Sequence, residues 1–102
     1  MEEPRVSIVI VNYNGRQWLE ACLSSVLESI YGNFGVVLVD NASSDESLQL
    51  VRERFPSVSV IASSENLGFA EGSNLGIRAA LATPAEYVVL LNPDTIVEPA
   101  WL

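Results

Sequence analysis

The side chains best suited to chemistry in this sequence are polar residues that directly follow apolar runs. Asp94 comes shortly after the apolar segment 87–91, within the sequence Asn92-Pro93-Asp94. One carboxylate, together with substrate phosphates and water, is a common arrangement for Mg²⁺ or Mn²⁺. Asp94 is therefore a candidate ligand for a divalent cation. The alternative is an ordinary Pro-Asp turn after a strand.

Three further polar groups follow apolar runs in the same way: Asn12-Tyr13-Asn14, Asp40-Asn41 and the segment 66–74. The ring of Tyr13 suits stacking on a nucleobase, but it equally suits capping the core with its hydroxyl in water. The amides of Asn12 and Asn14 both donate and accept hydrogen bonds, which fits the edge of a base. Asparagine is also common in turns.

Asp40 follows the apolar run 36–39. A carboxylate at this position can accept a hydrogen bond from the imide N–H of uracil or thymine, or from a ribose hydroxyl. The alternative is that Asp40 only caps the loop or helix that follows it. The residue type alone does not decide between these two roles.

The segment 66–76 is rich in glycine and resembles a phosphate-binding loop in composition. Gly68, Gly72 and Gly76 are spaced by four residues, so the segment matches neither the dinucleotide fingerprint nor a nucleoside-triphosphate loop. Gly72 and Gly76 fall one helical turn apart, and their alternative role is to allow a helix to pack closely on a sheet. Asn74 on the same helix is expected to face either a pocket or solvent.

Alternating strands and helices are predicted to position these groups. Continuous apolar runs predict four strands, and helical periodicity predicts a helix between each pair of them. The strands are 6–11, 36–39, 58–62 and 87–91, and the helices are 15–30, a second helix ending before Pro56, and 69–82. This βαβαβαβ order predicts an α/β fold, a Rossmann-like parallel sheet with helices on both faces.

The carboxyl ends of parallel strands form the ligand-binding edge of such a sheet. If the fourth strand lies beside the first, the pocket is expected between Tyr13-Asn14 and Asn92-Pro93-Asp94. Ser43 and Glu46 have the spacing of a capping box, so they are predicted to open the second helix. Cys22 falls on the apolar side of the first helix, where we expect a buried and unreactive thiol.

Composition narrows the class of protein. The chain of 102 residues has a net charge of −8, from thirteen acidic residues and five basic ones, and it contains no histidine. Nucleic acid is therefore not expected as a partner. An acidic protein binds an anion through backbone N–H groups, helix N-termini or a bridging cation. The acidic N-terminus and the absence of a long apolar segment predict a cytoplasmic protein without a transmembrane segment.

Four segments together resemble one family. They are 6–14, 39–45, 66–76 and 91–95, and their order and spacing are similar to those of the N-terminal half of a family 2 inverting glycosyltransferase. The resemblance runs from about Val6 to Leu102 and implies the nucleotide-sugar-binding GT-A fold. The motifs resemble those of rhamnosyltransferase-like members, which implies a polysaccharide or cell-wall acceptor.

The resemblance implies a role for each group. Tyr13 and Asp40 would hold the nucleobase, and Asp94 would ligate Mn²⁺ or Mg²⁺ bridging the two phosphates. The donor is expected to be a dTDP- or UDP-sugar, and the acceptor a glycan or a lipid-linked molecule. The candidate nucleotide-sugar-binding residues are Val11, Asn12, Tyr13, Asn14, Asp40, Asn66, Gly68, Gly72, Asn74, Asn92 and Asp94.

Two departures from the family pattern matter. Asn92 stands where the family's Asp-x-Asp element has its first acid, which weakens the charge that holds the metal. The general base of the family lies downstream of the metal motif, so it is expected beyond Leu102 and no catalytic residue is assigned here. Residues 1–102 are therefore predicted to be the nucleotide-sugar-binding portion, truncated after the metal motif and not active alone. In the longer protein, attachment to the inner face of the membrane is expected.

Other classes of protein remain as alternatives. A non-catalytic assembly module would dimerise through the open edge of the fourth strand. A nucleotidyltransferase would need a glycine-rich basic loop after the first strand, where this chain has 12–16, Asn-Tyr-Asn-Gly-Arg. A receiver-like domain would need an acidic pair after the first strand and a late lysine, and the sequence has neither.

Overall fold

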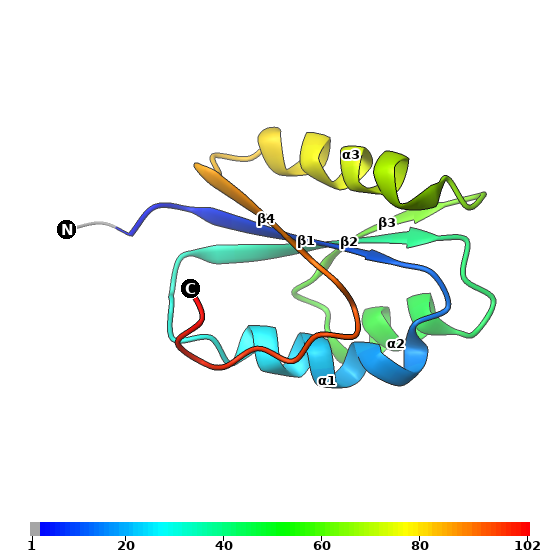
Figure 1. The fold of residues 1–102 in the computed structure, drawn as a ribbon, viewed down its shortest axis with the longest axis horizontal. Coiled ribbons are helices and arrows are strands. Elements are labelled where there is room, and N and C mark those ends of the chain that lie inside the picture. Colours follow the sequence, from blue (N-terminus) through cyan, green and yellow to red (C-terminus); the bar gives the residue numbers. More distant parts are fainter. Residues whose placement is uncertain (1–2) are drawn as a thin grey trace.

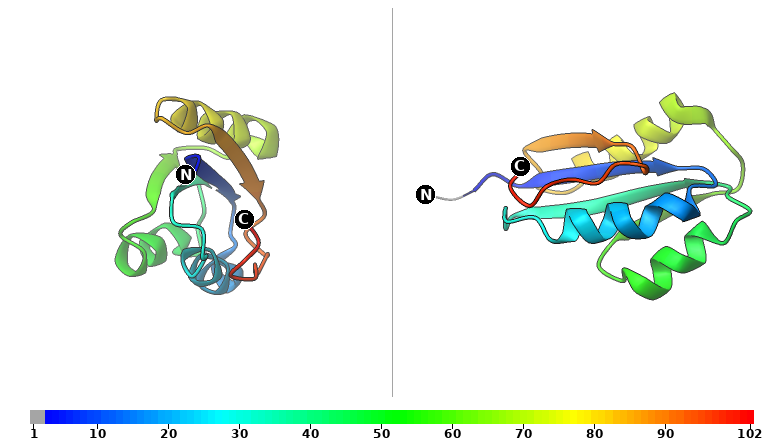
Figure 2. Two further views of the ribbon diagram at one scale, coloured as in Figure 1. Left: turned by 90° about the vertical axis from the view of Figure 1, so that its left-hand side faces the viewer. Right: turned by 60° about the horizontal axis from the view of Figure 1, so that its bottom comes forward.

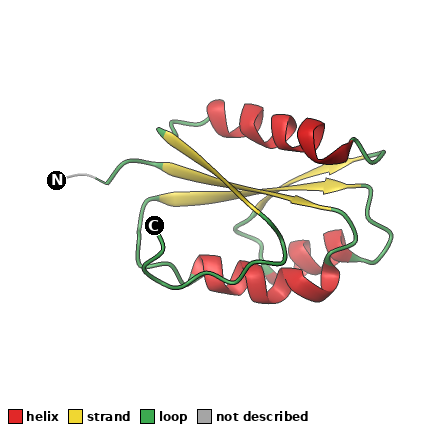
Figure 3. Cartoon of the chain, viewed as in Figure 1, coloured by secondary structure: helices red, strands yellow, loops and turns green. Residues whose placement is uncertain are grey.

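A computed structural model describes residues 3–102 and confirms the βαβαβαβ order (Figures 1 and 3). The elements are β1 (Val6–Asn12), α1 (Arg16–Leu27), β2 (Phe34–Asn41), α2 (Ser47–Arg54), β3 (Ser59–Ser63), α3 (Gly68–Leu81) and β4 (Tyr87–Leu91). The bounds of β4 are those predicted, whereas β1 and β2 extend further. As a result Asn12, Asp40 and Asn41 are the last residues of strands and do not follow them.

The four strands form one parallel sheet in the order β3-β2-β1-β4. Helices α1 and α2 cover one face and α3 covers the other, as Figures 1 and 2 show. This arrangement confirms the predicted fold class. It also confirms that β4 lies beside β1, with Ile10 level with Leu91. The loops that follow these two strands therefore begin at the same edge of the sheet, which we call the carboxyl edge.

The core consists of two apolar layers, because successive residues of a strand point to opposite faces of the sheet. Ile8, Ile10 and Leu38 pack with α1 on one face, whereas Val9 and Val37 pack beneath α3 on the other. Burial of β1 and β2 on both faces explains why their sequences contain continuous apolar runs. Each fully buried aliphatic side chain contributes about 1.5–3 kcal/mol relative to exposure.

Two glycines allow α3 to lie close to the sheet. A Cβ at Gly76 would lie closer than 3.0 Å to Cγ1 of Val9, and one at Gly72 would lie 2.9 Å from Val11 Cγ1 and from Asn41 Nδ2. Real Cβ atoms almost never come this close to another heavy atom. The packing role proposed for these glycines is therefore confirmed, and α3 is held against the carboxyl-edge half of β1 and β2.

The predicted capping box at the start of α2 is wrong. The helix begins at Ser47, and Glu46 before it has a left-handed backbone with φ of 68°. The N–H and hydroxyl of Ser47 both donate to Asp45 Oδ1, the N–H over 3.0 Å. The hydroxyl of Ser43 does not reach the helix because it bonds to Asp40 and Asn14 instead.

The segment after β4 runs back along α1 (Figures 1 and 2). Val97 N–H donates to Ser25 Oγ on α1 over 3.1 Å, and Trp101 Nε1 donates to Ser29 Oγ, just after the helix, over 2.7 Å. These contacts fix the path of the chain immediately after Asp94. Among residues 3–102, no helix combines the length and the apolar character needed to cross a membrane.

Candidate functional site

Asn12 and Asp40 form a buried polar pair at the carboxyl edge of the sheet. They are directly opposite each other in the parallel pairing of β1 and β2, and both side chains point to the α1 face. Asn12 Nδ2 donates to Asp40 Oδ1 over 3.0 Å, and the two residues are 0% and 2% exposed. A buried carboxylate is costly unless donors surround it, so this pair depends on further bonds.

Ser43, in the loop between β2 and α2, supplies those bonds. Its hydroxyl donates to Asp40 Oδ1 over 2.7 Å, and its backbone N–H donates to Asp40 Oδ2 over 3.1 Å. The same hydroxyl accepts from the backbone N–H of Asn14 over 2.8 Å and from Asn12 Nδ2 over 3.3 Å. Asp40 therefore caps the β2–α2 loop that follows it. Through the hydroxyl of Ser43, the same set of hydrogen bonds also holds the β1–α1 loop.

Asn14 completes the connection between the two loops. It adopts a left-handed backbone with φ of 52°, a conformation that asparagine tolerates better than most residues. Its side-chain oxygen accepts from the backbone N–H of Ser44 over 2.8 Å. The β1–α1 and β2–α2 loops thus bind each other in both directions, and Tyr13 lies between two anchored residues.

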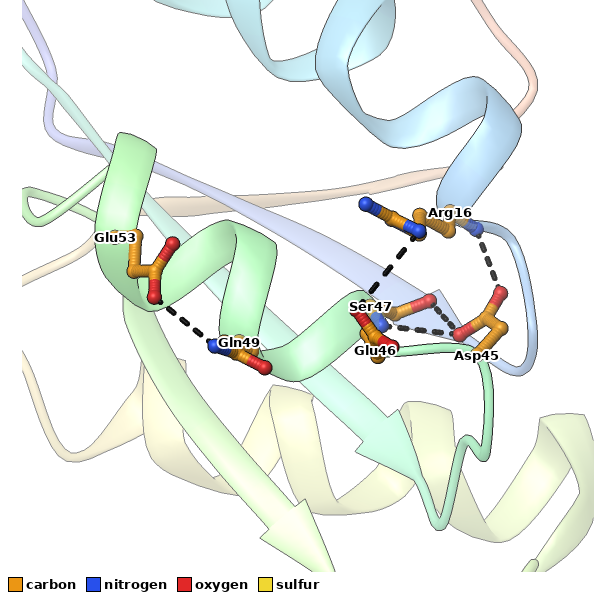
Figure 4. Close-up of polar contacts among 6 residues, drawn as sticks. All are labelled: Arg16, Asp45, Glu46, Ser47, Gln49 and Glu53. Carbon is orange, nitrogen blue, oxygen red and sulfur yellow. Dashed lines mark hydrogen bonds and ion pairs between the residues drawn. The ribbon is translucent and has the colours of Figure 1, made fainter.

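Asp45 joins the starts of two helices (Figure 4). Its Oδ2 accepts from the N–H of Arg16, the first residue of α1, over 3.0 Å, while Oδ1 binds Ser47 at the start of α2. Partial burial acts to raise the pKa of this carboxyl, but the hydrogen bonds from Ser47 and Arg16 outweigh it and hold the pKa below its ordinary value. Arg16 and Glu46 add an exposed ion pair at 3.9 Å.

Gly15 allows the β1–α1 loop to pack closely against the proposed metal motif, Asn92-Pro93-Asp94. A Cβ at Gly15 would lie closer than 3.0 Å to Asn12 Oδ1 and 3.7 Å from Pro93 Cβ. Asn12 Oδ1 is itself buried and has no hydrogen-bond partner in the described residues. The segment after β4 therefore packs beside the polar pair of β1 and β2, which places Asn92-Pro93-Asp94 next to the loop that carries Tyr13.

The α3 face of the same edge holds a second group of the predicted residues. Val11 contacts the helix at Gly72, and Asn41 Nδ2 donates to the carbonyl of Gly68 over 3.1 Å. Asn66 Oδ1 accepts from the N–H of Gly68 over 2.9 Å, where φ is 83°. These bonds fix the start of α3. Asn41 is the residue whose role sequence reasoning missed, although it was placed at the edge.

Asn92 and Asp94 are both exposed, at the end of β4. The thiol of Cys22 on α1 lies 3.8 Å from the carbonyl oxygen of Asn92, which it approaches as a donor. Burial raises the pKa of Cys22 to about 11; the Thr95 backbone opposes this rise and the Asp94 carboxylate adds to it. The predicted burial of Cys22 is confirmed, and a thiol with this pKa is almost wholly protonated at neutral pH.

Tyr13, which is 54% exposed, and Asn74 both lie at the surface, so neither side chain is part of the core. A hollow of about 610 Å³ borders the carboxyl edge and is lined by Asn14, Arg16, Gln17, Glu20 and Asp45. It shares only Asn14 with the predicted pocket and lies on the α1 side. Tyr13 and Asp94 do not line this hollow.

The donor set at Asp94 suits a divalent cation only in part. Within residues 3–102, no three acidic, cysteine or histidine side chains gather into a group that could hold a metal ion. Mg²⁺ and Mn²⁺ accept one or two carboxylates when phosphates and water supply the other oxygens. An exposed Asp94 therefore fits a cation that arrives with a phosphorylated ligand.

Comparison with known proteins defines the class. The model of the glycosyl transferase family 2 matches residues 7–102, and the chain belongs to this family. An uncharacterised glycosyltransferase of Haemophilus influenzae is 26% identical over 102 residues, which cover 97% of this chain and 31% of the relative. The chain thus spans about a third of the length of that relative.

Solved structures support the same fold. A mannosyltransferase of Pyrobaculum calidifontis, in complex with GDP-Man and Mn²⁺, is 28% identical and has a TM-score of 0.83, over 93% of this chain and 29% of the other. TarS 1–349 of S. aureus, in complex with UDP, has a TM-score of 0.83 at 22% identity, over 94% of this chain and 29% of the other. The parallel sheet flanked by helices is the GT-A arrangement.

Proposed function

We propose that residues 1–102 are the donor-binding portion of a glycosyltransferase and bind a nucleoside diphosphate sugar. The observation that carries the proposal is the meeting of the Asn12–Asp40 pair, the exposed ring of Tyr13 and the exposed Asp94 at one edge. The family supports the transferase class. Two structural relatives were solved with UDP and with GDP-Man and Mn²⁺, which supports this class of ligand.

In this proposal the base lies at β1 and β2. Tyr13 presents an exposed ring for stacking, and Asp40 Oδ2 accepts one protein hydrogen bond, so it retains capacity for one more. That capacity suits an imide N–H, which favours a UDP- or dTDP-sugar. Val11 and Asn14 would border the base, and the start of α3, with Asn66, Gly68, Gly72 and Asn74, would border the rest of the nucleotide.

The diphosphate would lie at the end of β4. Asp94 would hold Mn²⁺ or Mg²⁺, and Asn92 beside it would donate to or accept from the ribose. When bound, the cation neutralises charge on the departing nucleoside diphosphate. With Asn92 in place of an acid, Asp94 is the one carboxylate of this motif, so binding of the metal should depend on it.

The rest of the reaction lies outside the chain in this proposal. The general base would follow Leu102 in a longer protein, and residues 1–102 would not transfer sugar alone. A rhamnosyltransferase-like enzyme with a glycan or lipid-linked acceptor belongs to the proposal and derives from the resemblance of the motifs. A cytoplasmic location, at the inner face of the membrane in the longer protein, completes the proposal.

Thermal unfolding with UDP, dTDP and GDP, each with Mn²⁺ or with EDTA, tests the proposal. A ligand at about a hundred times its dissociation constant stabilises the native state by roughly 2.7 kcal/mol. We expect one nucleotide to raise the melting temperature with Mn²⁺, and Asp94→Ala to abolish the rise. Glu98→Ala, which removes another exposed carboxylate of the same segment, should keep it. Equal stabilisation of Asp94→Ala would disprove the metal assignment.

Self-assembly through β4 is the second candidate function. β4 is an edge strand, and Tyr87 and Leu90 on it are 60% and 47% exposed. An apolar edge strand with free backbone groups can pair with a second copy of itself. This candidate predicts a mass that rises with concentration and a melting temperature that no nucleotide changes.

A further inference from the structure

All hydrogen-bonding sites of the Ser43 hydroxyl are occupied by residues of β1, β2 and the β1–α1 loop. It donates to Asp40 Oδ1 over 2.7 Å and accepts from Asn14 N–H over 2.8 Å and from Asn12 Nδ2 over 3.3 Å. A serine hydroxyl has one donor and two acceptor sites, so these three bonds saturate it. Its rotation is therefore fixed, and it joins a carboxylate on β2 to the chain just after β1.

Two residues of the proposed base site depend on these bonds. One is Asp40, whose Oδ1 is held by Ser43 and Asn12 and whose Oδ2 is held by the Ser43 backbone. The other is Tyr13, whose neighbours on both sides bond to the same hydroxyl. Without the hydroxyl, Asp40 Oδ1 would keep one of two partners, and the Asn14 N–H would lose its partner.

We infer that Ser43 is a positioning residue for nucleobase recognition: it holds Asp40 and Tyr13 in one arrangement before the nucleotide binds. This inference rests on the proposed function. Ser43 acts through its neighbours, since its own bonding capacity is filled. When the groups of a site are ordered before the ligand binds, binding does not include the free-energy cost of ordering them. A variant in which these groups are disordered therefore binds more weakly.

We expect loss of the Ser43 hydroxyl to weaken binding of the nucleobase and not binding of the diphosphate. The turn that carries Asp94 is held by hydrogen bonds that do not include Ser43: the carbonyl of Asn92 accepts from Thr95 N–H over 3.2 Å and from the thiol of Cys22. A cation with inorganic pyrophosphate would use the Asp94 end alone. Loss of the Ser43 hydroxyl should therefore weaken a nucleoside diphosphate and leave pyrophosphate unaffected, a selectivity that a general loss of stability would not produce.

Calorimetric titration of the full chain tests this. The probes are UDP, dTDP and GDP with Mn²⁺, and pyrophosphate with Mn²⁺. For Ser43→Ala we expect an affinity at least about tenfold lower for the nucleotide that binds the unmodified chain best, because a hydrogen bond to a charged group is lost. Pyrophosphate affinity should change by less than about twofold. Ser43→Thr keeps the hydroxyl and should retain nucleotide affinity.

Ser44→Ala is the matched control, since it removes a neighbouring hydroxyl that only approaches Asn14 Oδ1 at 3.5 Å. If Ser43→Ala does not fold, Ser43→Cys fills the same space with a weak donor and should show the same selective loss. Nucleotide affinity unchanged in the folded variant, or an equal loss for pyrophosphate, overturns the inference while the proposed function stands. An unmodified chain that binds pyrophosphate but no nucleotide overturns both.

Discussion

The carboxylate of Asp40 is bound by Asn12 and by two groups of Ser43, so its orientation is set by the protein. Sequence reasoning left two roles open for Asp40, a cap for the next loop or an acceptor for a ligand. The structure contains the cap. Oδ2 accepts one protein hydrogen bond and keeps one acceptor position, but the residue is only 2% exposed, so the second role also requires a ligand to reach this buried oxygen.

Gly15 is the residue most sensitive to a small change. In Gly15→Ala the new Cβ would meet Asn12 Oδ1 closer than 3.0 Å, and neighbouring Pro93 limits movement away from it. Asn12 must then shift from Asp40, which weakens a buried polar pair. We expect a loss of about 1–3 kcal/mol in the free energy of unfolding, measured by urea denaturation.

Gly32→Ala is the control for that substitution. Among the described residues, its Cβ would meet only the flexible end of Glu3, with Oε1 at 3.4 Å, so the free energy of unfolding should stay within about 0.5 kcal/mol. Equal stability of the two variants would show that the Asn12 side chain moves freely, contrary to its burial at 0% exposure.

At the scale of elements, sequence periodicity was sufficient for the fold and insufficient for the loops. The run 87–91 forms β4 with the predicted bounds, because this short apolar segment pairs with β1 along its whole length. The capping box failed because Ser43 has partners about thirty residues away in sequence, and such contacts leave no local signal. The same reason hid the role of Asn41, whose partners are Leu67 and Gly68.

Asp45 connects elements that the sequence separates, because one carboxylate binds the first N–H of α1 and of α2. In Asp45→Asn only one oxygen remains, so one helix start loses its cap. We expect a loss of about 1 kcal/mol at pH 7, measured by urea denaturation. Glu65→Gln, at an exposed carboxylate between β3 and α3, should leave stability nearly unchanged.

The pH dependence of that effect follows from the lowered pKa of Asp45. A carboxyl with a lower pKa in the folded than in the unfolded state stabilises the protein above its unfolded pKa, near 3.8. The contribution is lost as the pH falls through the lower, folded value. The stability difference between the unmodified chain and Asp45→Asn should therefore shrink below pH 3.8. A difference that stays constant down to pH 2 would contradict the role assigned to the ionised carboxylate.

At the scale of the whole molecule, two properties oppose each other. The edge strand β4 favours association with a second copy, whereas a net charge of −8 on 102 residues opposes it. Repulsion between like-charged copies is screened over about 30 Å at 0.01 M salt and about 8 Å at 0.15 M. Association through β4 should therefore strengthen as salt is raised, the opposite of what an assembly held by ion pairs would show.

Leu90→Lys tests that association. A lysine on an exposed edge strand disfavours pairing with another strand, so sedimentation at 0.15 M salt should show a monomer where the unmodified chain shows a dimer. Leu81→Lys, at the end of α3 where Leu81 is 66% exposed, adds the same charge away from the edge and should leave the dimer intact. Because both substitutions make the chain less negative, charge alone would favour the dimer in both. A monomer only in Leu90→Lys therefore assigns the interface to β4, and an unmodified chain that stays monomeric at all concentrations rejects it.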